Sequence, residues 1–224
     1  MTVRQLVRRL QASRSYGFVL LLVLSTFVFV AAAPDEEWPR AVLVLLLAVT
    51  LAVALWTSAA GRLDVIATVL VGVGVAAAAA HLLTDNADAT GVLGLLDVLL
   101  VATTCAVIVF GIAGQHGVNV QSVLGALCIY LLFGMLYTFA YGAIAALESG
   151  PFYVQGTDGT PSIRLYFSVV TLATVGYGDY TAASDLGRTV AASEGLLGQI
   201  YLVTVVAVIV SRLRPARSAP ASEQ

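Results

Sequence analysis

The chain has 224 residues, of which 59% are hydrophobic and 11% charged, and its formal net charge is −2. This composition excludes an ordinary soluble domain and is typical of an all-α membrane protein in a lipid bilayer. The sequence holds no catalytic set, nucleotide-binding loop or metal-ligand cluster, so we expect neither an enzyme nor a nucleic-acid-binding protein.

Six apolar segments are long enough to cross a membrane, at roughly 17–33, 41–60, 64–82, 92–114, 121–147 and 189–211. A further apolar segment, about 162–173, is too short to cross and fits a re-entrant helix, which requires burial in protein. The first segment also resembles a signal peptide, because basic residues precede it and Ala31-Ala32-Ala33 offers small residues for cleavage. Its apolar run is longer than a usual signal core, and we therefore expect a retained span.

The arginines predict the orientation, because cytoplasmic loops are enriched in basic residues. All 11 basic residues are arginines, and eight of them flank the predicted spans on one side: Arg4, Arg8, Arg9, Arg14, Arg62, Arg212, Arg214 and Arg217. Six crossings then place both termini in the cytoplasm of a multi-pass protein of the plasma (inner) membrane. The opposite loops carry Asp35, Glu36, Glu37, Asp85 and Asp88.

The first four spans predict a separate transmembrane bundle, residues 1–114. The fourth span contains no arginine, and its only charged residue is Asp97. A voltage-sensing helix needs arginines that move through the membrane field, so we expect this bundle not to sense voltage. It either packs around the rest of the protein or senses a ligand, a lipid or pH.

Few side chains in the first five spans and their links are candidates for a chemical role. Cys105 and Cys128 lie inside spans four and five, where we expect them to be small packing residues without a disulfide. His116 lies in the short link 115–119, where a histidine either titrates near neutrality and biases the protein or is simply solvated. His81 lies at the end of the third span, where we favour a role as an interfacial anchor.

The most specific motif of the chain is Thr174-Val175-Gly176-Tyr177-Gly178, between the short segment and the last span. A dehydrated cation needs rings of oxygen atoms, and backbone carbonyls supply them only where successive carbonyls face the same side. A strand alternates its groups, whereas alternating dihedral handedness brings them together, and glycine at positions 176 and 178 tolerates the left-handed conformation. Thr174 adds a hydroxyl, and Val175 and Tyr177 should point away and wedge the segment in place.

This pentapeptide resembles the selectivity filter of the potassium channel family. Tyr166–Ala173 resembles the pore helix of that family, and Gly187-Arg188 resembles the start of its inner helix. The resemblance implies a potassium-selective channel in which potassium, the permeant ion and the one expected cofactor, binds through Thr174, Val175, Gly176 and Tyr177. One chain supplies one filter segment, so it implies a homotetramer with the pore on the fourfold axis.

The resemblance also divides the chain, with a pore module at 115–213 and a disordered cytoplasmic tail at 214–224. Many prokaryotic relatives carry a large ligand-sensing domain after the inner helix. The 11 residues of the tail are too few to fold, so regulation of that kind would need a separate regulatory subunit.

The outer mouth departs from the family pattern. Many relatives support the aspartate after the filter, here Asp179, with a tryptophan and a glutamate of the pore helix. Tyr166 stands at the tryptophan position and Val170 at the glutamate position. We therefore expect Tyr166 alone to tether Asp179. Thr181 occupies the position at which relatives sensitive to external tetraethylammonium carry an aromatic residue.

The last span contains three unusual residues, Glu194, Gly195 and Gly198. The resemblance places a gating hinge at Gly198, but two glycines one turn apart also permit close packing. A carboxylate inside a membrane helix is a functional candidate. Glu194 either supports the pore helix through Ser168 or Thr171, with Gln199 as another possible partner, or faces the cavity and attracts cations.

The alternative function is a non-conducting regulatory subunit or a transporter-associated membrane subunit. Potassium transporters with related pores usually carry four degenerate filter segments in one long chain. This chain has a single filter with the full glycine pattern, which favours the channel.

Overall fold

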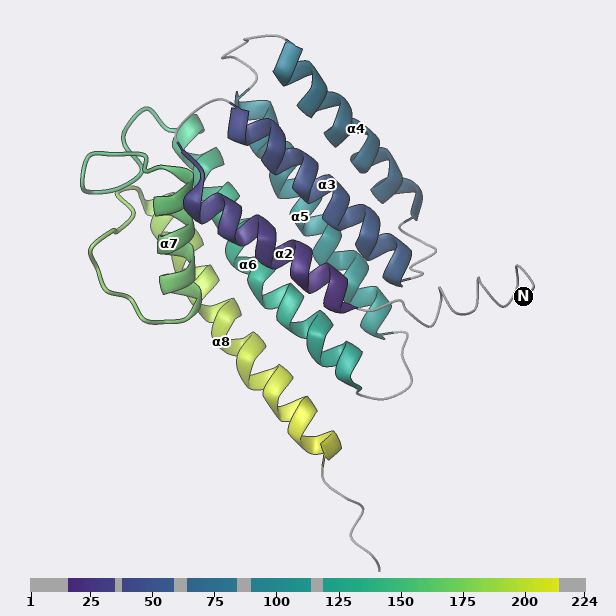
Figure 1. The fold of residues 1–224 in the computed structure, drawn as a ribbon. Helices are drawn as coiled ribbons and strands as arrows, with labels where there is room; N and C mark the ends of the chain where they lie inside the picture. Colours follow the sequence, from purple (N-terminus) through teal and green to yellow (C-terminus); the bar gives the residue numbers. More distant parts are fainter. Residues whose placement is uncertain (1–15, 35–37, 59–63, 84–89, 114–118, 214–224) are drawn as a thin grey trace, which may run out of the picture.

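The computed structural model describes residues 16–34, 38–58, 64–83, 90–113 and 119–213 (Figure 1). In this part of the chain it is all-α, with helices α2 (Tyr16–Ala32), α3 (Trp38–Ser58), α4 (Asp64–Leu83), α5 (Thr90–Ala113), α6 (Val120–Leu147), α7 (Pro161–Leu172) and α8 (Asp185–Leu213). The predicted segments all correspond to helices, and α8 begins at Asp185, four residues before the predicted span.

Three helical segments of the described chain are long and apolar enough to cross a membrane: Pro39–Ser58, Gly94–Ala113 and Val120–Leu147. Two shorter apolar helical segments are Tyr16–Ala32 and Val65–Ala77. The structure therefore supports a multi-pass membrane protein.

Helix α6 lies at the centre of the arrangement (Figure 1). It packs against α5 and α2 on one side and against α7 and α8 on the other. Helix α3 packs against α2, α4 and α5, and α4 lies at the outer edge of the bundle. The first four described helices thus lie beside the C-terminal helices of their own chain, and one apolar core runs from α2 through α3 and α5 to α6.

The start of α6 is fixed by a capping box. Asn119 Oδ1 accepts a hydrogen bond from the Ser122 backbone N–H at 3.0 Å, and Ser122 Oγ accepts one from the Asn119 N–H at 3.4 Å. Both bonds satisfy amide groups that have no partner inside the helix. The residue at which α6 begins is therefore set by side chains close to it in the sequence.

The loop between α6 and α7, residues 148–160, is irregular, but it pairs with the segment that follows the pentapeptide. Tyr153 and Ala182 form an antiparallel bridge. The Val154 N–H donates to the Thr181 carbonyl at 3.0 Å, and the Ala183 N–H donates to the Phe152 carbonyl at 2.8 Å. The two segments therefore hold each other in register.

An aromatic cluster lies beneath this pairing and joins it to the helices. Tyr141 of α6 contacts Phe152 and Phe167, with ring centroids 5.2 and 5.1 Å apart, and Phe152 contacts Tyr153 at 4.8 Å. The cluster connects α6, the loop and α7 through buried side chains.

Cys105 and Cys128 are free and buried, which confirms the prediction of packing residues without a disulfide. The N-terminal arginines, Arg62, His116 and the tail 214–224 lie outside the described residues. His81 lies in α4, but its side chain is not among those described.

Candidate functional site

The backbone of the pentapeptide alternates in handedness. Thr174, Gly176 and Gly178 have positive φ angles of 55°, 57° and 78°. The prediction for the two glycines is confirmed, and Thr174 extends the alternation by one position at the inner end. A non-glycine residue in this conformation costs about 1–2 kcal/mol, so surrounding contacts must hold Thr174 there. Alternating handedness is the backbone pattern that the carbonyl-ring hypothesis requires.

These contacts come from the end of α7. The helix begins at Thr160, whose Oγ1 accepts from the Ile163 N–H at 3.2 Å, and Pro161 occupies its first turn. At its other end the Thr171 carbonyl accepts from the Thr174 N–H at 2.9 Å. The Val170 carbonyl accepts from the Val175 and Gly176 N–H groups at 2.9 and 3.3 Å. The short-helix prediction is confirmed, and this helix end holds the first half of the pentapeptide by its amides.

Asp179 receives the predicted bond from Tyr166. The phenol Oη donates to Asp179 Oδ2 at 2.8 Å, which confirms the expected tether. A phenol is protonated at neutral pH, so Tyr166 is the donor of this bond. The Tyr166 ring also stacks on Tyr177, with centroids 6.5 Å apart and planes inclined by 6°. The Val170 carbonyl binds the amides of Val175 and Gly176 and not Asp179.

Gln155 binds the backbone of Asp179, whereas the bond from Tyr166 is made to the Asp179 carboxylate. Gln155 Nε2 donates to the Asp179 carbonyl at 2.6 Å, and its Oε1 accepts from the Thr181 N–H at 3.5 Å. The sequence gave no indication of this role, since a polar residue in an irregular loop is ordinary. The pairing of the loop with residues 181–183 brings Gln155 to this position.

Tyr180 turns toward the aromatic cluster. Its ring makes edge contacts with Tyr153 at 5.2 Å and with Tyr166 at 6.3 Å. Thr181 is exposed beside it and carries no aromatic ring. At the predicted outer mouth, the aromatic ring of Tyr180 therefore packs against the protein, and Thr181 is the exposed residue.

Glu194 is fully buried between three helices. Its Oε2 accepts a hydrogen bond from the Tyr141 hydroxyl of α6, and its Oε1 is hydrogen-bonded to Ser168 Oγ of α7. The predicted support through Ser168 is confirmed. The cavity-facing alternative is wrong, because Glu194 has no exposed surface even in the single chain.

Of the other proposed partners of Glu194, neither Thr171 nor Gln199 is bonded to it. Tyr141, which the sequence did not single out, is the second partner. It lies 53 residues away along the chain, so no local pattern could identify it.

The two glycines of α8 differ in their surroundings. A Cβ added to Gly198 would overlap the carbonyl oxygen of Leu172 and lie 2.9 Å from Leu172 Cδ1. At Gly195 the nearest atom would be the Thr171 carbonyl oxygen at 3.6 Å, an ordinary contact. Close packing against the end of α7 therefore explains Gly198. Helix α8 runs without a break through both positions, and a hinge there stays a prediction.

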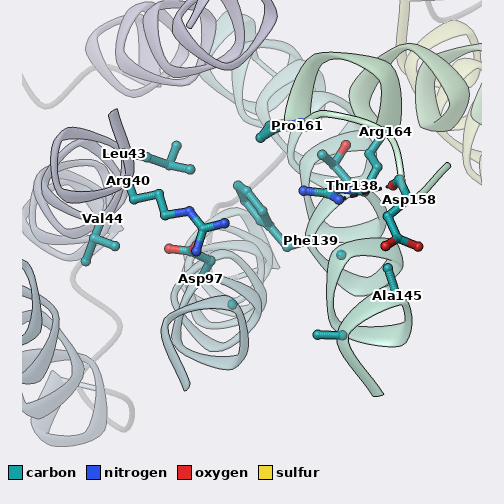
Figure 2. A pocket seen from close by; sticks show the side chains of 13 residues that line it. Arg40, Leu43, Val44, Asp97, Thr138, Phe139, Ala145, Asp158, Pro161 and Arg164 are labelled. Atoms are coloured by element: carbon teal, nitrogen blue, oxygen red, sulfur yellow. Dashed lines mark hydrogen bonds between the residues drawn. The ribbon is translucent and has the colours of Figure 1, made fainter. Parts of the chain in front are cut away.

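A charged cavity of about 250 Å³ lies where the first helices meet α6 and α7 (Figure 2). Arg40 of α3 and Asp97 of α5 line it from one side, and Thr138 of α6 and Arg164 of α7 from the other. Asp97 is buried, and its Oδ1 has no hydrogen-bond partner within the described chain. Arg164 Nη1 donates to the carbonyls of Asp158 and Gly159 at 3.2 and 2.9 Å. The charged residue of the fourth span thus faces the boundary between the two halves of the chain.

Comparison with known proteins identifies the C-terminal part of the chain. Residues 125–214 match the family model described as "Ion channel". The match covers nearly all of α6, the loop, α7, the pentapeptide and α8, and it leaves out the first four described helices. This match supports an ion channel function for the C-terminal part of the chain and does not point to an enzyme. No curated protein and no solved structure matched the chain.

Proposed function

We propose that the chain is one subunit of a homotetrameric potassium channel. Residues 174–178 form its selectivity filter, and potassium binds through the carbonyls of Thr174, Val175, Gly176 and Tyr177. The observation that carries this proposal is the positive φ at Thr174, Gly176 and Gly178. That alternation turns successive carbonyls toward one side, as a ring of oxygens that replaces ion hydration requires.

Exposed apolar side chains support assembly around an axis. Val175 and Tyr177 are 52% and 71% exposed in the single chain, and Leu196, Ile200 and Val203 of α8 are exposed as well. A large apolar surface is normally covered by lipid or by a partner. Four copies with the pentapeptide at the centre would cover the filter side chains and close the ring of carbonyls.

The membrane topology belongs to the same proposal. Six spans would place both termini in the cytoplasm of a bacterial-type cell and the filter near the outer surface. Asp179 then lies at the outer mouth, where negative charge favours the entry of cations. Residues 115–213 form the pore module, and the tail 214–224 is cytoplasmic.

Residues 1–114 act in this proposal as an accessory bundle without voltage sensing. The contacts of α2 with α6 and α7, and of α5 with α6, attach the bundle to the pore module of its own chain. Ser162 Oγ, in the first turn of α7, donates to the Ala31 carbonyl of α2 at 3.0 Å. The bundle therefore reaches the helix that supports the filter and stabilises its position.

A flux assay tests the channel assignment. The full-length chain, purified and reconstituted in liposomes, should release potassium rapidly and sodium much more slowly, because the carbonyl ring replaces the hydration shell of potassium. Cross-linking in the same liposomes should give a species of four copies. Equal release of the two ions would contradict the filter assignment. A stable tetramer without flux would favour a non-conducting regulatory subunit.

A further inference from the structure

Ser168 lies between two oxygen atoms and has one hydrogen to share. Its Oγ is 2.7 Å from the Gly134 carbonyl oxygen of α6 and is also hydrogen-bonded to Oε1 of Glu194. The carbonyl has no hydrogen, so in this contact only the serine hydroxyl can be the donor. If the serine donates to the carbonyl, the hydrogen in the second bond comes from the carboxyl group of Glu194.

The same carbonyl attracts another side-chain donor. Thr138 Oγ1 donates to Gly134 O at 2.7 Å. This backbone oxygen is therefore turned toward hydroxyl groups from both α6 and α7. A Ser168 hydroxyl turned toward Glu194 would leave two lone pairs facing each other across 2.7 Å, which is unfavourable.

The surroundings of Glu194 also favour a neutral acid. Glu194, Tyr141 and Ser168 are each fully buried. No basic side chain of the described chain forms an ion pair with Glu194. The titratable side chains around it are tyrosines: Tyr130, Tyr137 and Tyr141 of α6 and Tyr153 of the loop. Burying a carboxylate without a positive partner is far more costly than burying a neutral acid that is hydrogen-bonded on both oxygens.

We propose that Glu194 is a neutral carboxylic acid whose proton lies between Oε1 and Ser168 Oγ. The hydrogen-bonded chain then runs from Tyr141 to Glu194, from Glu194 to Ser168 and from Ser168 to the Gly134 carbonyl. In this arrangement every hydroxyl donates once, and three helices are joined behind the filter. Glu194 is thus a positioning residue that fixes α7 between α6 and α8.

The consequence for conduction rests on the proposed function, whereas the location of the proton does not. Ser168 lies on α7 two and three residues before Val170 and Thr171, whose carbonyls hold the amides of the filter. A displacement of Ser168 would therefore be passed directly to Thr174, Val175 and Gly176.

Infrared spectroscopy of the full-length protein in liposomes at neutral pH tests the proton directly. A protonated carboxyl group absorbs at a higher frequency than a carboxylate. The parent should show such a band, Glu194→Gln should lose it, and Asp97→Asn should retain it as the control for the other buried carboxyl group. A spectrum in which Glu194→Gln removes only carboxylate absorption would overturn the proposal.

Two further variants keep the test decisive if Glu194→Gln does not fold. Ser168→Ala and Tyr141→Phe each remove one partner but leave the acid in place. The carboxyl band should persist in both and shift to higher frequency as a hydrogen bond is lost. Absence of the band from both variants and from the parent would refute a neutral Glu194.

Conduction provides the readout of positioning. Glu194→Gln retains one donor and one acceptor, so it should conduct with the selectivity of the parent. Glu194→Ala leaves Tyr141 and Ser168 without their partner and should inactivate severalfold faster. Equal behaviour of the two variants would overturn the positioning role. A parent that shows the band but does not conduct would refute the channel assignment alone.

Discussion

Gly178 offers the sharpest test of the proposed filter geometry. Its φ is +78°, and a Cβ added there would meet no atom within 4 Å in the chain. Gly178→Ala therefore introduces backbone strain without steric overlap inside the subunit. The left-handed conformation costs a non-glycine residue about 1–2 kcal/mol, or about 4–8 kcal/mol over four subunits.

This strain should remove selective conduction. Because each 1.4 kcal/mol corresponds to a factor of ten, about 4 kcal/mol would lower the population of the conductive filter by about a thousandfold. Potassium and sodium efflux from liposomes measures the effect. We expect Gly178→Ala to lose rapid potassium release while it still assembles as a tetramer.

The chain supplies two matched controls. Gly156 in the loop has φ +80° and equally open surroundings, so Gly156→Ala carries the same strain outside the filter. Gly150 is also open and has no positive φ, so Gly150→Ala tests the added methyl group alone. Both variants should keep the potassium-to-sodium flux ratio of the parent. If Gly178→Ala conducts like Gly156→Ala, the carbonyl-ring assignment fails.

Four further predictions concern gating, the outer mouth and packing. Open probability should depend little on voltage in symmetric potassium, because the fourth span has no arginine; a steep dependence equivalent to several elementary charges would contradict this. External tetraethylammonium should block the parent weakly, and Thr181→Tyr should increase the block through cation–π contact; strong block of the parent would refute the reasoning. Tyr166→Phe removes the bond to Asp179 and should change the inactivation rate. Val170→Ala keeps the carbonyl that holds the proposed filter and should change the inactivation rate much less. Patch recordings that give equal rates for Tyr166→Phe and the parent would be inconsistent with the tether. Gly198→Ala should destabilise the protein by about 1–3 kcal/mol through overlap with Leu172, and thermal unfolding should show no comparable loss for Gly195→Ala.

The sequence alone determined the features that depend on local chemistry. The apolar runs predicted the helices because a bilayer-spanning segment must be apolar over its length. The glycines at 176 and 178 predicted the left-handed positions, since only glycine adopts them at little cost. The bond from Tyr166 to Asp179 was also predicted, from the resemblance of the segment around Tyr166 to the pore helix of the potassium channel family.

Tertiary structure decided which distant residues meet. Gln155 reaches Asp179 only because the loop pairs with residues 181–183, and a loop glutamine carries no periodic signal. Tyr141 reaches Glu194 across the packing of α6 on α8, and the same packing excludes the cavity-facing position that the sequence left open. Gly198 is explained by the approach of Leu172. Contacts of this kind depend on how helices cross, and hydrophobic patterns fix the buried face of a helix without fixing its neighbour.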